Sequence, residues 1–212
     1  MDEPVKPAQG LPGDSTEQRI FDAAHEIFVQ KGMDGAKMQE IADKAGINKA
    51  LLHYYYRTKE KLYEMVAKAV LNRAVPTVQK MIESDDPLEL KIRRFVDFYI
   101  DVVSHNTFVP LFLISEMNKH PDRFFEIILP KDLPKPEVFF RQVEEAIEAG
   151  TIRRIKPQHL IINMVSMCVF PFVAKPMMRM VLGMNSGEMH IFIQERKEEI
   201  TNFIFAALRP GP

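Results

Sequence analysis

A short segment rich in lysine and tyrosine carries the side chains of this sequence that are best suited to contact a nucleic acid. Between residues 44 and 61, five basic residues and three consecutive tyrosines accompany one acid, although the formal net charge of the whole chain is -1. Ammonium, guanidinium and phenol groups suit contacts with phosphate oxygens, and counterion release makes such binding salt-dependent. The segment therefore predicts double-stranded DNA as a partner. A helical hairpin with a solvated charged face is the alternative interpretation.

Two short helices joined by a tight turn must hold these side chains outward. Apolar residues at helical spacing over 38–45 predict the first helix, and Gly46 supplies the left-handed residue that ends it. Asn48 can cap the second helix, expected from about residue 49 to 56, by accepting a backbone hydrogen bond. Leu52 would face the core. The side chains left outward are Lys49, Ala50, His53 and Tyr54, with Leu51 and Tyr55 at the boundary.

Three stretches extend this pattern: IFDAAHEIFVQKG at 20–32, IADKAGINKALLHYYY at 41–56 and TKEKLY at 58–63. In these stretches the chain resembles the N-terminal domain of TetR/AcrR-type transcriptional regulators. That domain has a first helix ending in glycine, a Gly-containing turn, and a recognition helix followed by a Lys-bearing fourth helix. The resemblance implies an all-α fold, in which a three-helix helix-turn-helix DNA-binding domain precedes a helical bundle for ligand binding and dimerisation.

The resemblance also implies roles for individual residues in DNA binding. It implies that Lys59, at the start of the fourth helix, binds a phosphate. Lys37 stands where such regulators usually carry Thr or Ser, so the helix after it loses a side-chain cap and gains a possible phosphate-binding cation. Leu51 replaces a frequently small or polar residue and could contact a thymine methyl. The predicted DNA-binding residues are Lys37, Asn48, Lys49, Ala50, Leu51, His53, Tyr54, Tyr55 and Lys59.

Composition predicts a tail and two domains. The chain has 212 residues with 46% hydrophobic content, enough to bury a core. Residues 1–14 mix proline, glycine and charge without periodicity, which predicts a flexible tail; they lack the apolar core of a signal peptide. We expect the helix-turn-helix domain at 15–60 and the ligand-binding and dimerisation domain at 61–212. A single cysteine, Cys168, suits a reducing compartment, so we expect a cytoplasmic protein.

Helical periodicity continues through the second domain without a convincing strand pattern. A long helix is expected over 59–83, bent near Pro76, and the next one, ending near His105, is expected to bury Phe95, Phe98 and Val102. Residues 157–182 are apolar almost all round. Their apolar core, 160–174, is shorter than the roughly 20 residues that a bilayer requires, so no membrane contact is expected. We predict a homodimer through residues about 157–207, and the resemblance implies a two-fold symmetric four-helix interface.

Abundant methionine and phenylalanine, 13 and 15 residues, suit an adaptable cavity for an unknown small apolar effector, although at most single positions a plain hydrophobic core is the favoured explanation. The family resemblance implies that such a ligand displaces the long helix expected over 59–83, so that the protein releases DNA. His105, Glu116 and Asn163 are candidate polar anchors. The candidate ligand-binding residues are Phe95, Phe98, His105, Phe112, Glu116, Phe139, Phe140, Asn163, Met164, Met167 and Phe172.

The sequence offers no constellation for catalysis. Its six histidines lack metal-ligand spacing, no glycine-rich phosphate loop is present, and Cys168 has no neighbouring base or cation. We therefore predict no catalytic residues, no metal site and no cofactor. Two hypotheses remain: a repressor released from a palindromic operator by its ligand, or a helical protein-interaction module without sequence-specific DNA binding.

Overall fold

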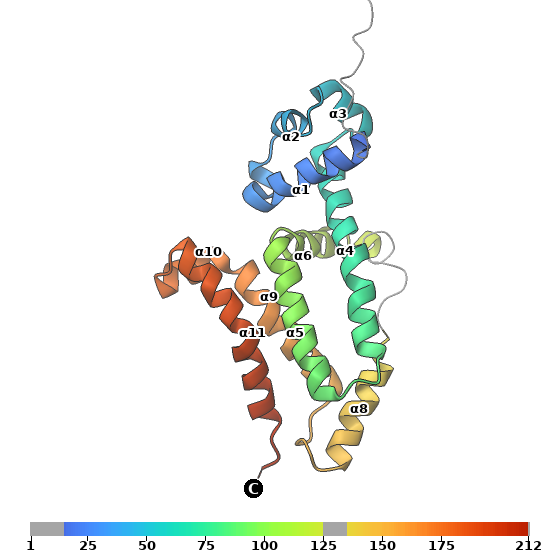
Figure 1. Ribbon diagram of the computed structural model, residues 1–212, viewed down its shortest axis with the longest axis vertical. Coiled ribbons are helices and arrows are strands. Elements are labelled where there is room, and N and C mark those ends of the chain that lie inside the picture. The colour runs from blue at the N-terminus through green and yellow to red at the C-terminus, as the bar shows by residue number, and fades with distance from the viewer. Residues whose placement is uncertain (1–14, 125–134, 212) are drawn as a thin grey trace, which may run out of the picture. The chain divides into compact units, whose positions relative to one another are not determined.

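Helices form the described structure, a computed structural model that covers residues 15–124 and 135–211. The predicted tail over residues 1–14 lies outside these ranges. The expected all-α class is confirmed, and the described residues include no strand. The chain divides after Val70 into two compact units, and helix α4 (Lys59–Glu83) contributes residues to both (Figure 1).

The first unit contains α1 (Thr16–Gly35), α2 (Met38–Lys44), α3 (Lys49–Tyr55) and the start of α4. The Ser15 hydroxyl begins α1 by accepting a hydrogen bond of 3.1 Å from the backbone N–H of Gln18. Gly32, where the glycine pattern predicts the helix to end, has a left-handed φ of 65°, and one further turn follows it. The core of the unit is made by Ile20, Ala24, Phe28, Ile41, Ala42, Leu52, Leu62 and Val66.

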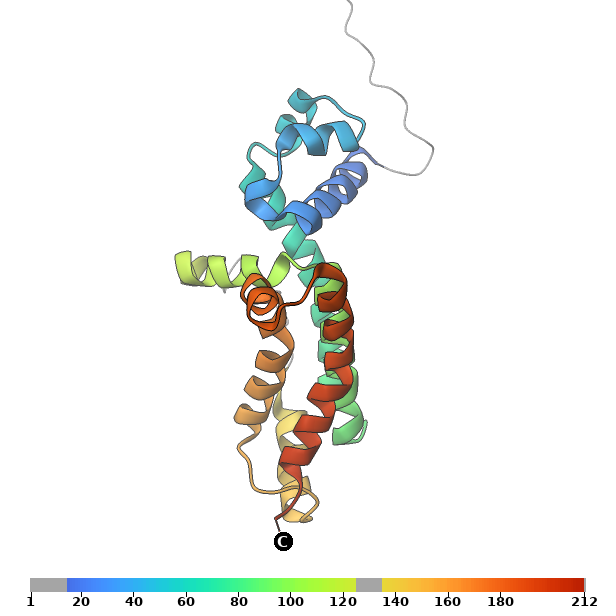
Figure 2. The ribbon, with the colours of Figure 1, turned by 90° about the vertical axis from the view of Figure 1, so that its left-hand side faces the viewer.

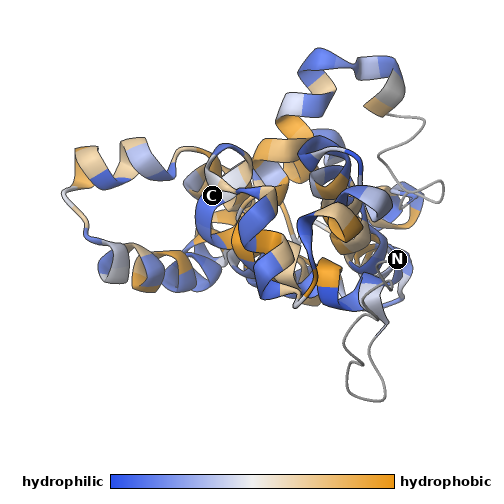
Figure 3. Cartoon of the chain, turned by 90° about the horizontal axis from the view of Figure 1, so that it is seen from above, coloured by the Kyte–Doolittle hydropathy of each residue, from blue (hydrophilic) through white to orange (hydrophobic). Residues whose placement is uncertain are grey.

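The second unit is a bundle whose central helices pack side by side. α5 (Leu88–His105), α9 (Pro157–Val173) and α11 (Ser186–Leu208) contact one another, and α8 (Glu137–Glu148) packs on α5 and α9 (Figures 1 and 2). Figure 3 shows hydrophobic and hydrophilic residues mixed along the helices of the chain; α5 and α8 are strongly amphipathic, whereas α9 is apolar almost all round. The remaining helices are α6 (Val109–Lys119), α7 (Pro121–Arg123) and α10 (Lys175–Leu182).

The buried stripe of α5 differs from the predicted one. Ile92, Val96, Ile100 and Val103 are buried, whereas Phe95, Phe98 and Val102 are only half-buried. The predicted stripe is therefore wrong by about one residue around the helix. α5 contacts both α9 and α11, so its most enclosed sector is the one that faces both neighbours.

Two prolines shape the apolar segment 157–182, which forms two helices rather than one. The helix breaks at Ala174, just before Pro176 in the first turn of α10, and the chain bends by 77° from α9 to α10. Pro171 stays inside α9. Because proline lacks an N–H, the carbonyl of Met167 loses its helical donor, and the Arg196 guanidinium supplies one at 3.2 Å.

No single helix in the described ranges is long and apolar enough to cross a bilayer. Two bent pairs of helices pass the length and composition test jointly, namely α5 with α6 and α9 with α10.

Candidate nucleic-acid interface and cavities

A complete glycine-based cap forms the turn between α2 and α3. Gly46 adopts φ +66°, its N–H donates to the Asp43 carbonyl at 3.1 Å, and the N–H of Ile47 donates to the Ala42 carbonyl at 3.0 Å. This pair of bonds defines a Schellman motif and satisfies the last carbonyls of α2. The turn fixes the direction in which α3 leaves α2.

α3 begins as the sequence predicts. The Asn48 side-chain oxygen accepts the backbone N–H of Leu51 at 2.7 Å, which leaves the Asn48 amide NH₂ group available to a phosphate. Leu52 is fully buried between α3 and the rest of the unit and anchors the helix. One side of α3 is thereby held inward, and the opposite side faces solvent.

The solvent-facing side of α3 carries the predicted contact residues. Lys49, Ala50 and His53 are exposed, and Tyr54 has 81% of its surface exposed. The rings of Tyr54 and Tyr55 pack edge to face, perpendicular to each other with their centroids 5.8 Å apart, which limits how freely either ring moves. Leu51 is half-buried. The structure therefore gathers these residues on one face, of a size that fits a major groove.

Ion pairs decide which lysines near this face are available. Lys44 pairs with Glu26 at 2.6 Å and Lys31 pairs with Glu40 at 3.0 Å, and these hydrogen bonds lower the pKa of each carboxyl group. Those two cations are neutralised within the chain. Lys37 stands at the start of α2 and Lys49 at the start of α3. Among the described residues, no acid lies within ion-pair distance of either lysine.

Lys59 has a structural contact that the sequence does not reveal. Its ammonium donates to the backbone carbonyl of Ala36 at 3.1 Å, at the end of α1. An ammonium has three donor protons, so this bond leaves two for a phosphate. Lys59 therefore ties α4 to the segment before α2 and remains able to take the predicted phosphate contact.

Residues 20–66 match the sequence profile described as "Bacterial regulatory proteins, tetR family". The protein belongs to the TetR family. It is a DNA-binding transcriptional regulator with a helix-turn-helix domain, and the family consists of regulators rather than enzymes. The matched range contains α2, the turn, α3 and the start of α4, the elements that carry the exposed face.

The relatives of this TetR-family chain include a protein named as an activator and one named as a repressor. The HTH-type transcriptional activator FasR of Mycolicibacterium smegmatis is 30% identical over 97 residues, which span 46% of this chain and 44% of FasR. The HTH-type transcriptional repressor SCO4008 of Streptomyces coelicolor is 28% identical over 175 residues, 80% of this chain and 85% of that protein. Regulation of transcription is thus common to both, whereas its direction differs.

A solved structure has the same fold along most of the chain. HlyIIR, a hemolysin II transcriptional regulator, superposes with a TM-score of 0.57 at 22% identity, covering 93% of this chain and 100% of that one. At this identity the likeness establishes the fold alone.

Three of the predicted ligand-binding residues meet at one cavity of the second unit. Phe95, Phe139 and Met164 line a cavity of about 200 Å³, together with Val78, Met81, Ile82, Lys91, Ile161 and Val165. The cavity lies between the second half of α4 and helices α5, α8 and α9. We refer to it as the α4 cavity.

The other predicted ligand-binding residues lie elsewhere. Asn163 and Met167 line a separate cavity of about 280 Å³ between α9 and α11. Phe112 and Phe172 are buried, and Phe98, Phe140 and Glu116 are half-buried, but none lines the α4 cavity. His105 is exposed, with its Nδ1 atom 2.7 Å from the Asp101 carbonyl. The structure does not bring the three predicted polar anchors, His105, Glu116 and Asn163, together.

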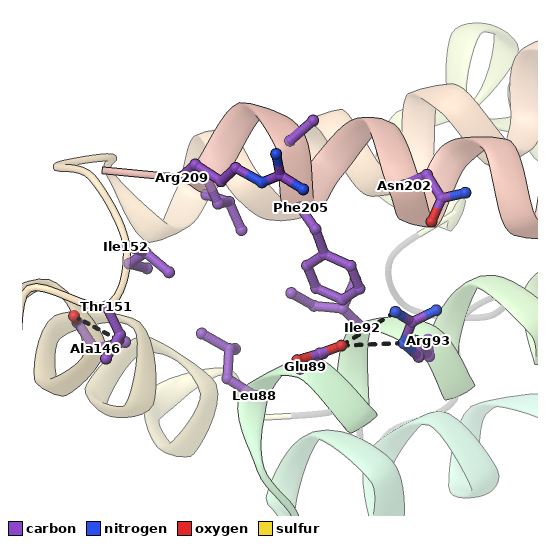
Figure 4. Close-up of a pocket in the computed structure, with 12 residues that line it drawn as sticks. Leu88, Glu89, Ile92, Arg93, Ala146, Thr151, Ile152, Asn202, Phe205 and Arg209 are labelled. Carbon is purple, nitrogen blue, oxygen red and sulfur yellow. Dashed lines mark hydrogen bonds and ion pairs between the residues drawn. The ribbon is translucent and has the colours of Figure 1, made fainter. Parts of the chain in front are cut away.

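A third cavity is an open groove of about 650 Å³ that no predicted residue lines (Figure 4). Arg93 stands on one side, held by Glu89 at 3.1 Å and placed 4.8 Å over the Phe205 ring. Arg209 lines the same groove, and within the described ranges no acid lies at ion-pair distance from it. The groove therefore combines apolar side chains, among them Leu88, Ile152 and Phe205, with polar and charged ones such as Glu89, Thr151 and Asn202.

Sequence reasoning missed Lys91, the charged side chain of the α4 cavity. It is 3% exposed, and it precedes Ile92 on the buried stripe of α5. A lysine at an apolar position of an amphipathic helix is the signal that could have identified it, because lysine is rarely buried without a partner.

Cys168 is expected to be inert in the folded protein. It is 1% exposed, and burial raises its pKa from 9.0 to about 12, which alone lowers the thiolate fraction near pH 8 by about a thousandfold. Iodoacetamide should therefore label Cys168 only after urea unfolds the chain, as intact mass spectrometry would reveal. Equal labelling rates in native buffer and urea would contradict this placement.

No group of three or more His, Cys, Asp or Glu residues in the described ranges could hold a metal ion.

Proposed function

We propose that this regulator is a homodimeric repressor that binds an inverted repeat and leaves it when a small, largely apolar effector occupies the second unit. The observation that carries the DNA part is the exposed face of α3, with Lys49, His53 and Tyr54 outward and Leu52 buried behind them. Residues Lys37, Asn48, Ala50, Leu51, Tyr55 and Lys59 complete the proposed contact surface.

The homodimer is supported by large apolar side chains that the single chain leaves uncovered. Ile162 and Phe170 on α9 are 62% and 53% exposed, and Ile191 and Phe203 on α11 are 59% and 65% exposed. Exposed apolar side chains gathered on neighbouring helices mark a surface that another molecule covers. A second copy related by a two-fold axis would bury the same residues from both chains, within the range 157–207.

Two-fold symmetry gives the dimer its DNA requirement. Two recognition helices can enter successive major grooves only if they lie about one helical turn, roughly 34 Å, apart. α4 begins at Lys59 directly after α3, and Val78, Met81 and Ile82 near its end line the α4 cavity. A ligand that prefers one position of α4 would change the spacing, with a coupling of about 1–3 kcal/mol. Such a protein acts where the DNA is, in the cytoplasm.

Selection of duplexes from a random pool tests this proposal. Purified full-length protein should recover an inverted repeat whose half-sites are centred about 10 base pairs apart, or a multiple of that spacing. Recovery should fall steeply as salt is raised. A pool that stays random at low salt would instead favour a helical protein-interaction module whose basic segment binds an acidic partner.

A further inference from the structure

The α4 cavity has almost wholly apolar walls, and one buried lysine, Lys91, is among the residues that line it. Its lining residues other than Lys91 are valine, isoleucine, methionine and phenylalanine. An engineered cavity of about 150 Å³ with similar walls is large enough to bind benzene, and this one measures about 200 Å³. The cavity is therefore suited to a compact body, either a single ring or a short alkyl chain.

The Lys91 ammonium is bound by a neutral backbone carbonyl rather than by an anion. Its ammonium donates a hydrogen bond of 2.8 Å to the backbone carbonyl of Ile82, in the last turn of α4, where carbonyls lack helical donors. An ammonium has three protons, and one hydrogen bond is recorded for it in the described structure. Burial lowers the pKa of Lys91, and the carboxylates of Asp85 and Asp86 oppose that shift while Arg141 adds to it.

We propose that the effector is a small organic carboxylate whose apolar body fills the α4 cavity and whose anionic end binds the Lys91 ammonium. This inference rests on the proposed ligand response of the second unit. A bound carboxylate would pair directly with this ammonium, on which Asp85 and Asp86 act only from beyond ion-pair distance in the described structure, whereas an alcohol offers one neutral acceptor and an amine adds a second positive charge. The site thus discriminates by charge among molecules of equal size.

The same contact links the ligand to the long helix. Both partners of the Lys91–Ile82 bond line the cavity, and Ile82 belongs to α4. A carboxylate that draws the ammonium towards itself competes with the Ile82 carbonyl and releases the end of α4. The ligand then favours the position of α4 in which this bond is broken, which is the differential affinity that a coupled equilibrium requires.

Binding of matched probes to the full-length protein tests the proposal. Hexanoate and benzoate should bind wild type, measured by titration calorimetry, at least about tenfold more tightly than hexanol and hexylamine. Lys91→Met keeps the length and apolar stem of the side chain and should weaken hexanoate binding by about tenfold to a hundredfold. Hexanol binding should be unchanged or tighter in this variant.

Arg209→Gln is the matched control, because the groove beside Phe205 is a second place where a carboxylate could bind. Its hexanoate affinity should stay within about twofold of wild type. The proposal is overturned if hexanol binds wild type as tightly as hexanoate, or if Arg209→Gln loses binding and Lys91→Met keeps it. If Lys91→Met does not fold, a preference for hexanoate over hexanol that Arg209→Gln retains supports the proposal, and the absence of this preference in wild type overturns it.

This titration needs no DNA, so its failure is separable from failure of the proposed function. Selection of an inverted repeat together with no preference for carboxylates would refute the ligand class and leave the regulator intact. Carboxylate binding without any effect on a recovered duplex would refute ligand-controlled repression and leave the site intact.

Discussion

Phe28→Ala is expected to unfold the DNA-binding unit. Phe28 is fully buried, and its ring packs edge-on against Tyr63 with the centroids 4.7 Å apart, so it connects α1 to α4. Removing a buried phenylalanine ring costs about 3–5 kcal/mol. Since whole domains are stable by only about 5–15 kcal/mol, a unit this small would be largely unfolded and DNA affinity would be lost.

Hydrogen exchange measured by mass spectrometry locates this effect. Amides of α1, α2 and α3 should lose protection, whereas amides of α5, α9 and α11 should keep it, because the latter belong to the second unit. Phe21→Ala, in the same helix at a half-buried position, is the control and should retain both protection and DNA binding. Unchanged protection of α1 in Phe28→Ala would mean that the ring is not central to this core.

The DNA-binding unit was predictable from sequence because local chemistry specifies it. Gly46 is needed where the backbone adopts a left-handed conformation. Asn48 caps α3 by accepting the backbone N–H of Leu51, three residues later, and helical periodicity places Leu52 on the inward face. Each rule joins residues no more than five positions apart. The resulting exposure of Lys49 and Tyr54 follows from the same periodicity.

The second unit was less predictable because its decisive contacts join distant residues. Which side of α5 is buried depends on where α9 and α11 pack, and a single-helix pattern favoured Phe95 and Phe98 over Val96 and Ile100. The Lys91 ammonium donates to the Ile82 carbonyl and the Arg196 guanidinium donates to the Met167 carbonyl, and each replaces a backbone N–H donor that the helix does not supply. Sequence spacing predicts that carbonyl groups near prolines and at helix ends lack a backbone donor, but it does not predict which side chain donates to them.

Removing two lysines should lower the salt dependence of DNA binding more than a change in net charge explains. Lys37 and Lys49 stand at the starts of α2 and α3, where backbone N–H groups also favour anions, and among the described residues neither forms a direct ion pair. The hydrogen bond from Lys31 lowers the pKa of Glu40, and Lys37 contributes to the same shift. If each binds one phosphate, Lys37→Ala with Lys49→Ala removes four contacts per dimer. The slope of log K against log salt should then become shallower by about 3–4.

The matched control removes the same charge from lysines that are already paired. Lys31→Ala with Lys44→Ala frees Glu40 and Glu26 and changes the net charge equally, but those lysines are engaged within the chain. Fluorescence anisotropy on the selected duplex, over a series of salt concentrations, should give a slope close to wild type for this control. Equal slopes for the two double variants would show that overall charge attracts DNA without phosphate contacts at the helix starts. A shallower slope for the Lys37 and Lys49 variant alone assigns those contacts to the starts of α2 and α3, because both double variants remove the same charge and the lysines of the control are already paired with Glu40 and Glu26.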